Sequence, residues 1–558
     1  MVRVLFFGTH PSQYNGYSKV VYELMSCLST KQDMQFTVYG FQKFNSHQGH
    51  RDDLPSNIEV YDAFESENPR QQGFGITEVR SFVNKNKPDV CIVYNDMMIL
   101  HQVITQLKLA QKEDGLSFKI IAYIDQVYLN QKKEFIDFIN ANADYALMFT
   151  KYWEDIAIEQ GITLPHGFLP HGFNKEIYYP IPKHLCRLHY SLREEDFVIL
   201  NLNRNQPRKR WDVCLKALAE IVSRYPREPI KMMVGTAVQG AWNLIEIYER
   251  ELKKRGLTLQ DGMQHLIVFD RPQRVTDEET NILYNIADIG INTCDGEGFG
   301  LCNFEQAALG VPQVVPRLGG FIDFFDDESA ALVDPKIAYY VDNTRDAVCG
   351  EALICDYVDF VEAIEQYYFN KERRQKHGSN ARSKILRDYK WSDIADKLHG
   401  IIKEVCGVSS SSSANASSAT SSSNTSQLID EIEKIDLSLL QKLAKNKNKT
   451  ETKENESIPI LTPPQSPTLA PAPAPAVVPV PAVIPTPEPV VPTPEAIALT
   501  TTVPPPTPPV AATTSPTDDK KSEKEKKKAK RQKELLKLKK KLAELIGDSD
   551  DDDDSDDE

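Results

Sequence analysis

The 558-residue chain has little of what zinc-binding, secreted or membrane proteins are built from. Its nine cysteines all lie at or before Cys406, form no C-x-x-C pair and fit no zinc spacing. Their odd number favours a reducing compartment over a set of disulfides. The most apolar late stretch, APAPAPAVVPVPAVIP, is broken by proline every few residues and cannot satisfy its backbone as a helix in lipid. We therefore expect a cytoplasmic protein with no membrane span.

The N-terminus and the charge distribution argue against a secreted protein and against a nucleic-acid-binding protein. MVRVLFFGTHPS has one basic residue and a very short apolar run, so it predicts a first strand rather than a signal peptide. The formal net charge is −15, and much of the charge lies near the C-terminus, where a basic block (520–541) precedes an acidic one (548–558). Global acidity argues against nucleic acid as the main partner.

Composition changes abruptly near residue 407. Residues 407–558 contain Ser-rich, Pro-rich, Lys-rich and Asp-rich tracts, which are typical of a disordered tail. Segments 427–445 and 535–546 place leucine and isoleucine at helical or heptad-like spacing but are too short for a coiled coil. We expect transient helices there that bind a protein partner. Tails of this composition occur in eukaryotes and in large DNA viruses that infect them, and the sequence leaves the source open.

The first 405 residues alternate short apolar runs with amphipathic segments, which is typical of an α/β fold with parallel sheets. One predicted helix, GYSKVVYELMSCL (16–28), has Val20, Val21, Leu24 and Leu28 on one face. The expected strands are 2–7, 35–41, 89–94, 118–124 and 144–150, then 197–203, 230–235, 265–270, 287–293 and 312–316. These series predict two doubly wound domains joined near 176–185, with ligands at the carboxyl ends of the strands.

The stretch DGEGFGLCNFEQAALGVP (295–312) holds two glutamates, Glu297 and Glu305, around a Gly-Phe-Gly that opens a predicted short helix. One continuous helix would separate their Cα atoms by about 12 Å. This is wider than the roughly 5–9 Å of paired-carboxylate glycosidases, so the two are not a close acid–base pair. The glycines and the helix start between the two glutamates favour the binding of an anion. A sugar nucleotide, with hydroxyl-rich groups on both sides of a diphosphate, would fit; the alternative is an ordinary capped helix with Glu305 on the surface.

A basic loop follows the strand expected at 197–203. In NLNRNQPRKRWD (201–212), Arg204 and Lys209 lie at the carboxyl end of the strand. Arginine offers a planar fork and lysine a point charge to phosphate oxygens, so the two would neutralise a leaving diphosphate without a metal. Arg208 and Arg210 are expected to be solvated, and a solvated basic surface is the alternative for the whole loop.

Together these motifs resemble those of the retaining glycosyltransferases of family 4, whose GT-B fold has two facing Rossmann-like domains with a cleft between them. GEGFGLCNFEQAALGVPQVVPRLGG has the family's Glu-x7-Glu pair, Gly-x-Pro strand and Gly-Gly turn, and NRNQPRKRWD resembles its diphosphate loop. LPHGFNKEIYYP (169–180) resembles the end of its first domain and DYKWSDIADKLHGIIKEV (388–405) its closing helix. The resemblance implies domains at 1–180 and 181–387, a closing helix at 388–406 and the tail at 407–558.

The resemblance also implies roles for the matching residues. Glu305 would hold the ribose of a nucleotide, and Glu297, Arg204 and Lys209 would act in catalysis on the sugar and the diphosphate. Substrate contacts are also implied at Phe299, Gly300 and Leu301 through their backbone, and at Gly16 in GTHPSQYNGYSKVV (8–21).

The implied activity is a nucleotide-sugar-dependent hexosyl transfer that retains configuration and requires no cofactor and no metal. The acceptor would be a glycan, a protein or a small molecule. The sequence leaves the acceptor, the donor base and sugar, the oligomeric state and the purpose of the tail open.

The chain departs from the family pattern at two places, and the first of them favours an alternative to the enzyme. The family often has His-Asp after a strand of the first domain, where this chain reads Ile124-Asp125, so Asp125 would bind sugar or acceptor, or merely cap the strand. The Gly-Gly turn is followed by Phe321-Ile322-Asp323, where a glutamate is more usual. The missing histidine favours an inactive transferase-like module that binds a glycan or scaffolds through its tail. His166 and His171 in LPHGFLPHGF (164–173) need not converge, and we expect no metal site.

Overall fold

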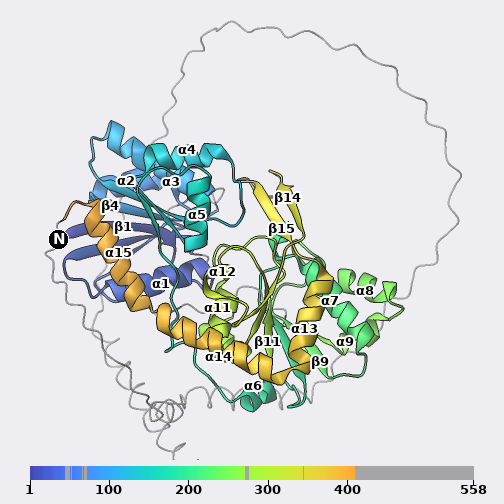
Figure 1. Cartoon of the computed structure of the whole chain (residues 1–558). Coiled ribbons are helices and arrows are strands. Elements are labelled where there is room, and N and C mark those ends of the chain that lie inside the picture. The colour runs from blue at the N-terminus through green and yellow to red at the C-terminus, as the bar shows by residue number, and fades with distance from the viewer. Residues whose placement is uncertain are drawn as a thin grey trace, which may run out of the picture. The chain divides into compact units, whose positions relative to one another are not determined.

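The computed structural model describes residues 1–43, 51, 53–65, 67, 72–269, 275–343 and 345–408, which all lie within one compact unit, Met1–Ile460. They form two α/β lobes, each built on a parallel sheet (Figure 1). The expectations of tail disorder beyond residue 408 and of helices at 427–445 and 535–546 lie outside the described residues. Within the described ranges, no helix is long and apolar enough to cross a membrane.

The N-terminal lobe has a seven-stranded parallel sheet in the order β3-β2-β1-β4-β5-β6-β7. Its strands are β1 (Val2–Thr9), β2 (Met34–Phe41), β3 (Glu59–Asp62), β4 (Val90–Asp96), β5 (Lys119–Asp125), β6 (Tyr145–Met148) and β7 (His166–Phe168). Each strand expected from the sequence is present. The two edge strands β3 and β7 were not predicted, because they are short and only half-buried and so lack a continuous apolar run.

Helices cover both faces of this sheet. They are α1 (Gly16–Leu28), α2 (Val79–Asn86), α3 (Met97–Glu113), α4 (Lys133–Asn142) and α5 (Lys151–Glu159), with a 3-10 turn η2 (Ile76–Glu78) before α2. α1 begins at Gly16 because the Asn15 side chain accepts a hydrogen bond from the Ser18 amide and the Ser18 side chain reciprocates, a capping box. Its four expected apolar positions are buried.

The C-terminal lobe has a six-stranded parallel sheet in the order β10-β9-β8-β11-β12-β13. Its strands are β8 (Phe197–Asn201), β9 (Ile230–Val234), β10 (Leu266–Val268), β11 (Ile289–Ile291), β12 (Gln313–Pro316) and β13 (Ala331–Val333). β13 was not predicted, and neither was the antiparallel hairpin of β14 (Ile337–Val341) and β15 (Gly350–Ile354). The helices are α6 (Lys183–His189), α7 (Trp211–Arg224), α8 (Leu244–Lys254), α9 (Leu259–Met263), α10 (Asp277–Ile286), α11 (Leu301–Ala308), α12 (Phe321–Phe324), α13 (Tyr357–Phe369), α14 (Lys371–Asp388) and α15 (Trp391–Val405), with a 3-10 turn η3 (Pro207–Lys209).

The last helix returns to the N-terminal lobe. α15 lies against α1, and Asp396 on α15 pairs with Lys31 just beyond the end of α1. His399 on the same helix lies 2.8 Å from Asp33. The orange α15 therefore runs beside the blue α1 in Figure 1.

The strand orders determine where loops from distant parts of the chain meet. Both sheets are wound outwards in two directions, and the order reverses between β1 and β4 in one lobe and between β8 and β11 in the other. At such a reversal the loops after the two strands diverge onto opposite faces and leave room for a ligand at the carboxyl ends. The functional residues expected from the sequence follow β1, β5, β8 and β11.

Candidate functional site at the lobe interface

The loop after β8 and the loop after β11 meet where the order of the C-terminal sheet reverses. The first ends in the 3-10 turn η3, and the second carries Glu297. The amide of Asp295 donates to the carbonyl of Arg208 at 2.9 Å. This bond ties the two loops together and brings the basic residues after β8 onto the glutamate after β11.

Glu297 is bound by both basic side chains of that turn. Its Oε2 pairs with the Lys209 ammonium, and its Oε1 lies 3.1 Å from Nη1 of Arg208. Burial by itself would raise the pKa of Glu297, but the charges of Lys209 and Arg208 overcome it and lower the pKa to about 2. Glu297 is therefore ionised at neutral pH, so it can accept hydrogen bonds but cannot act as a general acid.

The other basic residues of the loop have different surroundings. Arg204 is exposed, and within the described chain its side chain has no hydrogen-bond or ion-pair partner. The expectation that Arg208 and Arg210 are solvated was wrong, since Arg208 binds Glu297 and Arg210 pairs with Asp212 at 2.7 Å. The tight turn and the left-handed backbone of Arg210 (φ 47°) fold the loop back onto the strand ends.

α11 begins at Leu301 rather than at Glu297. Gly300 precedes it with a left-handed backbone (φ 92°), and a Cβ there would lie 2.3 Å from the ring of Phe321. The separation of about 12 Å for a continuous helix therefore does not apply to the two glutamates. Gly300 and Leu301 form the helix start, where backbone N–H groups favour an anion. The ring of Phe299 is buried in the core, so its backbone is the part that can face a ligand.

Glu305, the second glutamate, is bound from the opposite lobe. Nζ of Lys19 on α1 lies 2.7 Å from its Oε1 and 2.9 Å from its Oε2. Tyr284 on α10 donates to Oε2 at 2.9 Å. Glu305 is 3% exposed, so the alternative that it is a surface residue is wrong. Burial raises the pKa of Glu305, whereas Lys19 and Tyr284 act in the opposite direction.

The glycines around Glu297 face the N-terminal lobe. A Cβ on Gly296 would lie 2.5 Å from the carbonyl oxygen of Val127, and one on Gly298 would lie 2.1 Å from Oδ1 of Asp125. Trp153 on α5 donates to the Gly298 carbonyl at 2.8 Å. The sequence suggested that the glycines between the two glutamates, Gly298 and Gly300, admit a diphosphate. The structure shows that Gly296 and Gly298 also permit close approach of the opposite lobe.

Asp125 ends β5 and lies at the same interface. Tyr17 on α1 hydrogen-bonds one of its oxygens, and within the described residues Oδ1 has no partner. Burial raises the pKa of Asp125 to about 6, against the hydrogen bond from Tyr17 and the charge of Arg208. Gly16 faces Leu301 across the interface, where a Cβ would lie 3.3 Å from the leucine Cδ1.

The residues singled out in the sequence thus gather around one interface between the lobes. They are Gly16, Asp125, Arg204, Lys209, Glu297, Phe299, Gly300, Leu301 and Glu305. Lys209 and Glu297 are in direct contact, whereas Glu305 contacts Lys19 and Tyr284 instead of either of them.

Three contributing residues were not anticipated from the sequence. Arg208 was expected to be solvated, and Trp153 lies in none of the sequence motifs. Lys19 could have been found, because it lies three residues after Gly16 and therefore on the same face of a predicted helix. Asp323, in the place of a more usual glutamate, accepts a hydrogen bond from the Tyr152 amide at 3.1 Å and so contacts the start of α5.

The hairpin β14–β15 holds the loop after β5 against the loop after β11. Leu129 and Glu351 exchange backbone hydrogen bonds of 3.1 and 2.7 Å, which adds a short bridge between the N-terminal lobe and β15. Arg345, between the two strands, pairs with Asp295 two residues before Glu297 and lies 5.8 Å from the ring centre of Tyr128. The hairpin therefore supports the interface from one edge.

The two histidines of LPHGFLPHGF do not converge. Nδ1 of His166 lies 3.0 Å from Glu154, whereas His171 is buried among rings that include Phe149, Phe299 and Trp391. Neither ring nitrogen of His171 hydrogen-bonds any of the described residues, and burial lowers its pKa to about 3. In the part of the chain that the structure describes, no group of His, Cys, Asp or Glu side chains is arranged to hold a metal ion.

Replacing His171 by leucine is expected to stabilise the protein, and more so in mild acid. A buried imidazole without hydrogen bonds costs about 1–3 kcal/mol, which an apolar side chain of similar size avoids. Because the folded-state pKa of about 3 lies below the ordinary 6.5, the wild type loses stability as the pH falls below 6.5. This loss reaches about 2 kcal/mol at pH 5 and is absent from the variant.

Melting temperatures of wild type and His171→Leu at pH 7 and pH 5 measure both effects. His166→Leu is the matched control, since His166 is only half-buried and has a carboxylate partner. A His171→Leu protein that melts below the wild type at both pH values would contradict the prediction.

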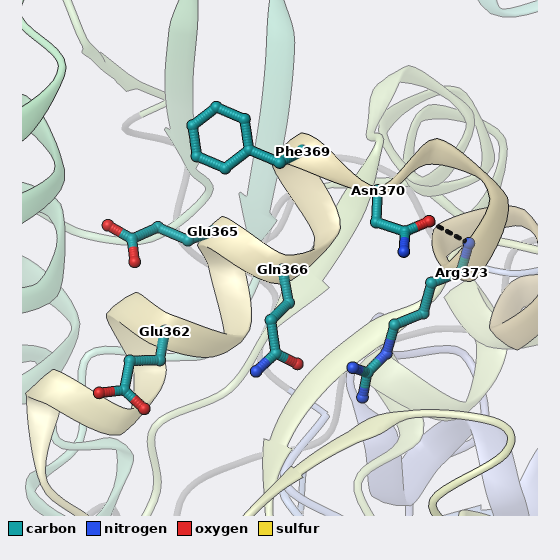
Figure 2. Close-up of a pocket in the computed structure, with 6 residues that line it drawn as sticks. All are labelled: Glu362, Glu365, Gln366, Phe369, Asn370 and Arg373. Carbon is teal, nitrogen blue, oxygen red and sulfur yellow. Dashed lines mark hydrogen bonds between the residues drawn. The ribbon is translucent and has the colours of Figure 1, made fainter.

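A separate hollow lies elsewhere on the C-terminal lobe. Figure 2 shows the residues that line it along α13 and the start of α14. Its volume is about 470 Å³, and the Arg373 amide donates a hydrogen bond of 2.8 Å to Asn370. It is lined by Glu362, Glu365, Gln366, Phe369, Asn370 and Arg373. It shares no residue with the interface described above and is not the candidate site.

Sequence comparison shows which family part of the chain resembles. Residues 193–398 match the profile described as "Family 4 Glycosyltransferase in conflict systems". D-inositol 3-phosphate glycosyltransferase from Corynebacterium diphtheriae is 27% identical over 205 residues, which are 37% of this chain and 42% of that protein. D-inositol 3-phosphate glycosyltransferase 2 from Catenulispora acidiphila is 32% identical over 165 residues, 29% of this chain and 37% of that protein. The chain thus spans less than half the length of these relatives.

Solved structures with the same fold cover both lobes. Sucrose-phosphate synthase from Thermosynechococcus elongatus superposes with a TM-score of 0.57 at 15% identity, over 73% of this chain and 100% of that one. HepE from Anabaena, solved in complex with UDP and glucose, superposes with a TM-score of 0.53 at 13% identity, over 72% and 100%. Residues 193–398, which carry both signature glutamates, therefore resemble family 4 of the glycosyltransferases, and the two lobes together have the GT-B fold.

Proposed function

We propose that this chain transfers a hexose from a nucleoside-diphosphate sugar to an acceptor hydroxyl, with retention of configuration and without a metal or other cofactor. One observation carries the proposal. Within the family-matched segment, Glu297, Arg208 and Lys209 meet at the point where the order of the C-terminal sheet reverses, the position at which such sheets bind nucleotides.

The charges of the site suit a departing diphosphate. Negative charge builds on the diphosphate as its bond to the sugar breaks, and preorganised cations that face it lower the barrier. Lys209 provides a buried positive charge and Arg208 a half-buried one, and Arg204 provides an exposed guanidinium that no described residue pairs with. The start of α11 adds backbone N–H groups.

The carboxylates have separate roles in this proposal. Glu297 stays ionised and accepts hydrogen bonds from the sugar, and Glu305 accepts from the ribose. Asp125 binds a hydroxyl of the sugar or the acceptor. The leaving phosphate takes the proton of the acceptor hydroxyl, so no protein nucleophile is needed. Glu297, Lys209 and Glu305 are all less than 10% exposed, so a donor reaches them when the lobes separate, and closure then excludes water.

A panel of UDP-, GDP- and ADP-sugars tests the proposal, starting from UDP-glucose because HepE is solved with it. A donor at a hundred times its Kd stabilises the folded state by about 2.7 kcal/mol and raises the melting temperature. We expect one base to stabilise most and its sugar to be released slowly in the absence of acceptor. Release should persist with a chelator, and the anomeric configuration of the product, followed by NMR, should match that of the donor.

The variants Glu305→Ala and Lys209→Ala should abolish sugar release. Lys253→Ala, at an exposed lysine of α8, is the matched control and should release sugar as the wild type does. If no nucleotide sugar stabilised the wild type, or if all the proteins released sugar equally, the chain would not be a transferase of this kind.

A further inference from the structure

Most acceptor positions of the Glu305 carboxylate are already used by protein donors. The Lys19 ammonium lies within 3 Å of both its oxygens, at 2.7 and 2.9 Å, and Tyr284 occupies a further position on Oε2 at 2.9 Å. A carboxylate has about four acceptor positions. These contacts use three of them and leave one, on Oε1.

The ammonium that binds Glu305 comes from the opposite lobe and is itself held in place. Lys19 projects from α1, its Nζ hydrogen-bonds the Tyr178 hydroxyl in the segment that links the lobes, and it lies 4.6 Å from the centre of that ring. Its side chain is 13% exposed and that of Glu305 is 4% exposed. The contact is therefore largely shielded from water and forms when the lobes are closed.

A second cross-lobe ion pair lies beside the first and does not touch Glu305, although its carboxylate, Asp277, also lies 3.9 Å from Nζ of Lys19. Arg51 binds Asp277 on α10 at 2.7 Å, with side chains 5% and 13% exposed. If the lobes needed only a tether, this pair and the packing of α15 would provide one. A buried ion pair is also weak as a source of stability, because desolvation offsets its attraction. The placement of Lys19 on both oxygens of Glu305 is better explained by what it does to that carboxylate.

We propose that Lys19 is a positioning residue for the donor: from the N-terminal lobe it orients the Glu305 carboxylate so that the remaining acceptor position on Oε1 receives a ribose hydroxyl. This inference rests on the proposed function. It means that the ribose is recognised by both lobes together, although the residue that contacts it lies on the C-terminal lobe.

Lys19 also determines the charge state in which Glu305 meets the ribose. Among the described residues, the ionisable groups that face Glu305 are Lys19 on α1, Tyr178 in the linking segment, Asp277 and Tyr284 on α10, and Cys302 on α11 itself. Burial and Asp277 raise the pKa of Glu305, whereas the charge of Lys19 and the hydrogen bond from Tyr284 lower it. Without Lys19 the pKa rises further, and a protonated Glu305 is a poorer acceptor. Ribose binding by a Lys19 variant should therefore strengthen as the pH rises.

Binding of UDP and of 2′,3′-dideoxy-UDP by calorimetry, from pH 6.5 to 9, tests the inference on the full-length chain. The wild type should prefer UDP at every pH. Lys19→Met should bind UDP about tenfold more weakly at pH 7 and bind the dideoxy compound as the wild type does, because a charge-assisted hydrogen bond to ribose is what it loses. Its affinity for UDP should recover towards pH 9. GDP and ADP with their dideoxy analogues replace UDP if the sugar panel selects another base.

Two further variants separate positioning from general loosening of the structure. Lys19→Arg keeps the charge and should retain the preference for UDP over the dideoxy compound. Lys31→Met breaks the ion pair between Lys31 and Asp396 of α15, which is separate from the contacts of Glu305, and should leave both the preference and its pH independence intact.

Each outcome is decisive. If Lys19→Met weakened UDP and the dideoxy compound equally, or kept the wild-type preference at every pH, Lys19 would not position Glu305, while the proposed function would stand. If the wild type bound none of UDP, GDP and ADP, the proposed function would fall and this inference with it.

Discussion

Lys209→Met is expected to lower the rate of sugar transfer by about 10²–10³-fold with little change in donor affinity. Lys209 is 7% exposed and binds Glu297 directly, so it lies where positive charge is worth more than in water. It acts most strongly when the diphosphate gains charge, so the loss should fall on kcat. Glu297 remains bound by Arg208 at 3.1 Å, which keeps the loops in register.

The measurement is kcat and KM with the donor that the sugar panel identifies. Lys209→Arg keeps a cation at the site and should retain more activity than Lys209→Met, while Lys253→Met serves as the exposed control. A Lys209→Met enzyme within threefold of the wild-type kcat would show that Lys209 has no part in the chemical step.

Gly296→Ala should also impair transfer strongly, for a steric reason. A Cβ on Gly296 would lie 2.5 Å from the Val127 carbonyl oxygen and 2.6 Å from the ring of Tyr128, both on the opposite lobe. A backbone carbonyl cannot turn aside as a long side chain can, so the lobes must move apart. A displacement of about 1 Å between reacting groups costs about 10²-fold in rate. We expect kcat/KM to fall by that factor while both lobes stay folded.

The matched control for Gly296→Ala is Gly400→Ala on α15. A Cβ at Gly400 meets nothing within 4 Å, so alanine there should stabilise the helix by about 0.5–1 kcal/mol and leave transfer unchanged. Equal kcat/KM for Gly296→Ala and the wild type would mean that the contact between Gly296 and Val127 is not needed for catalysis.

The sheet architecture was predictable because it depends on local sequence. Buried parallel strands read as continuous apolar runs, as in VRVLFFGT, and the helices between them show a regular apolar face. The edge strands β3 and β7 were missed because they are only half-buried and lack a continuous apolar run. β13 was also missed, although it is as long as the predicted β10 and β11. The hairpin β14–β15 was also missed, although β14 reads IAYYV; this apolar run is largely exposed, and β15 is buried or half-buried.

The residues of the candidate site were also predictable, since Glu297, Arg204, Lys209 and Glu305 lie in motifs that directly follow predicted strands. Their partners were not. These partners lie far away in the sequence. Glu297 binds Arg208 and Lys209, at least 88 positions earlier, and Glu305 binds Lys19 from the opposite lobe. Gly296 and Gly298 likewise face residues of the other lobe.

The sequence by itself thus determined the α/β class, the two sheets and the residue types at the carboxyl ends of their strands, because the apolar patterns of strands and helices depend only on residues close together in the chain. The tertiary structure alone decided which charges pair, which glycines are needed for close approach and which glutamate is held from the opposite lobe. The reason is physical: burial and charge pairing depend on the distance between side chains in the folded protein, and no local pattern records that distance.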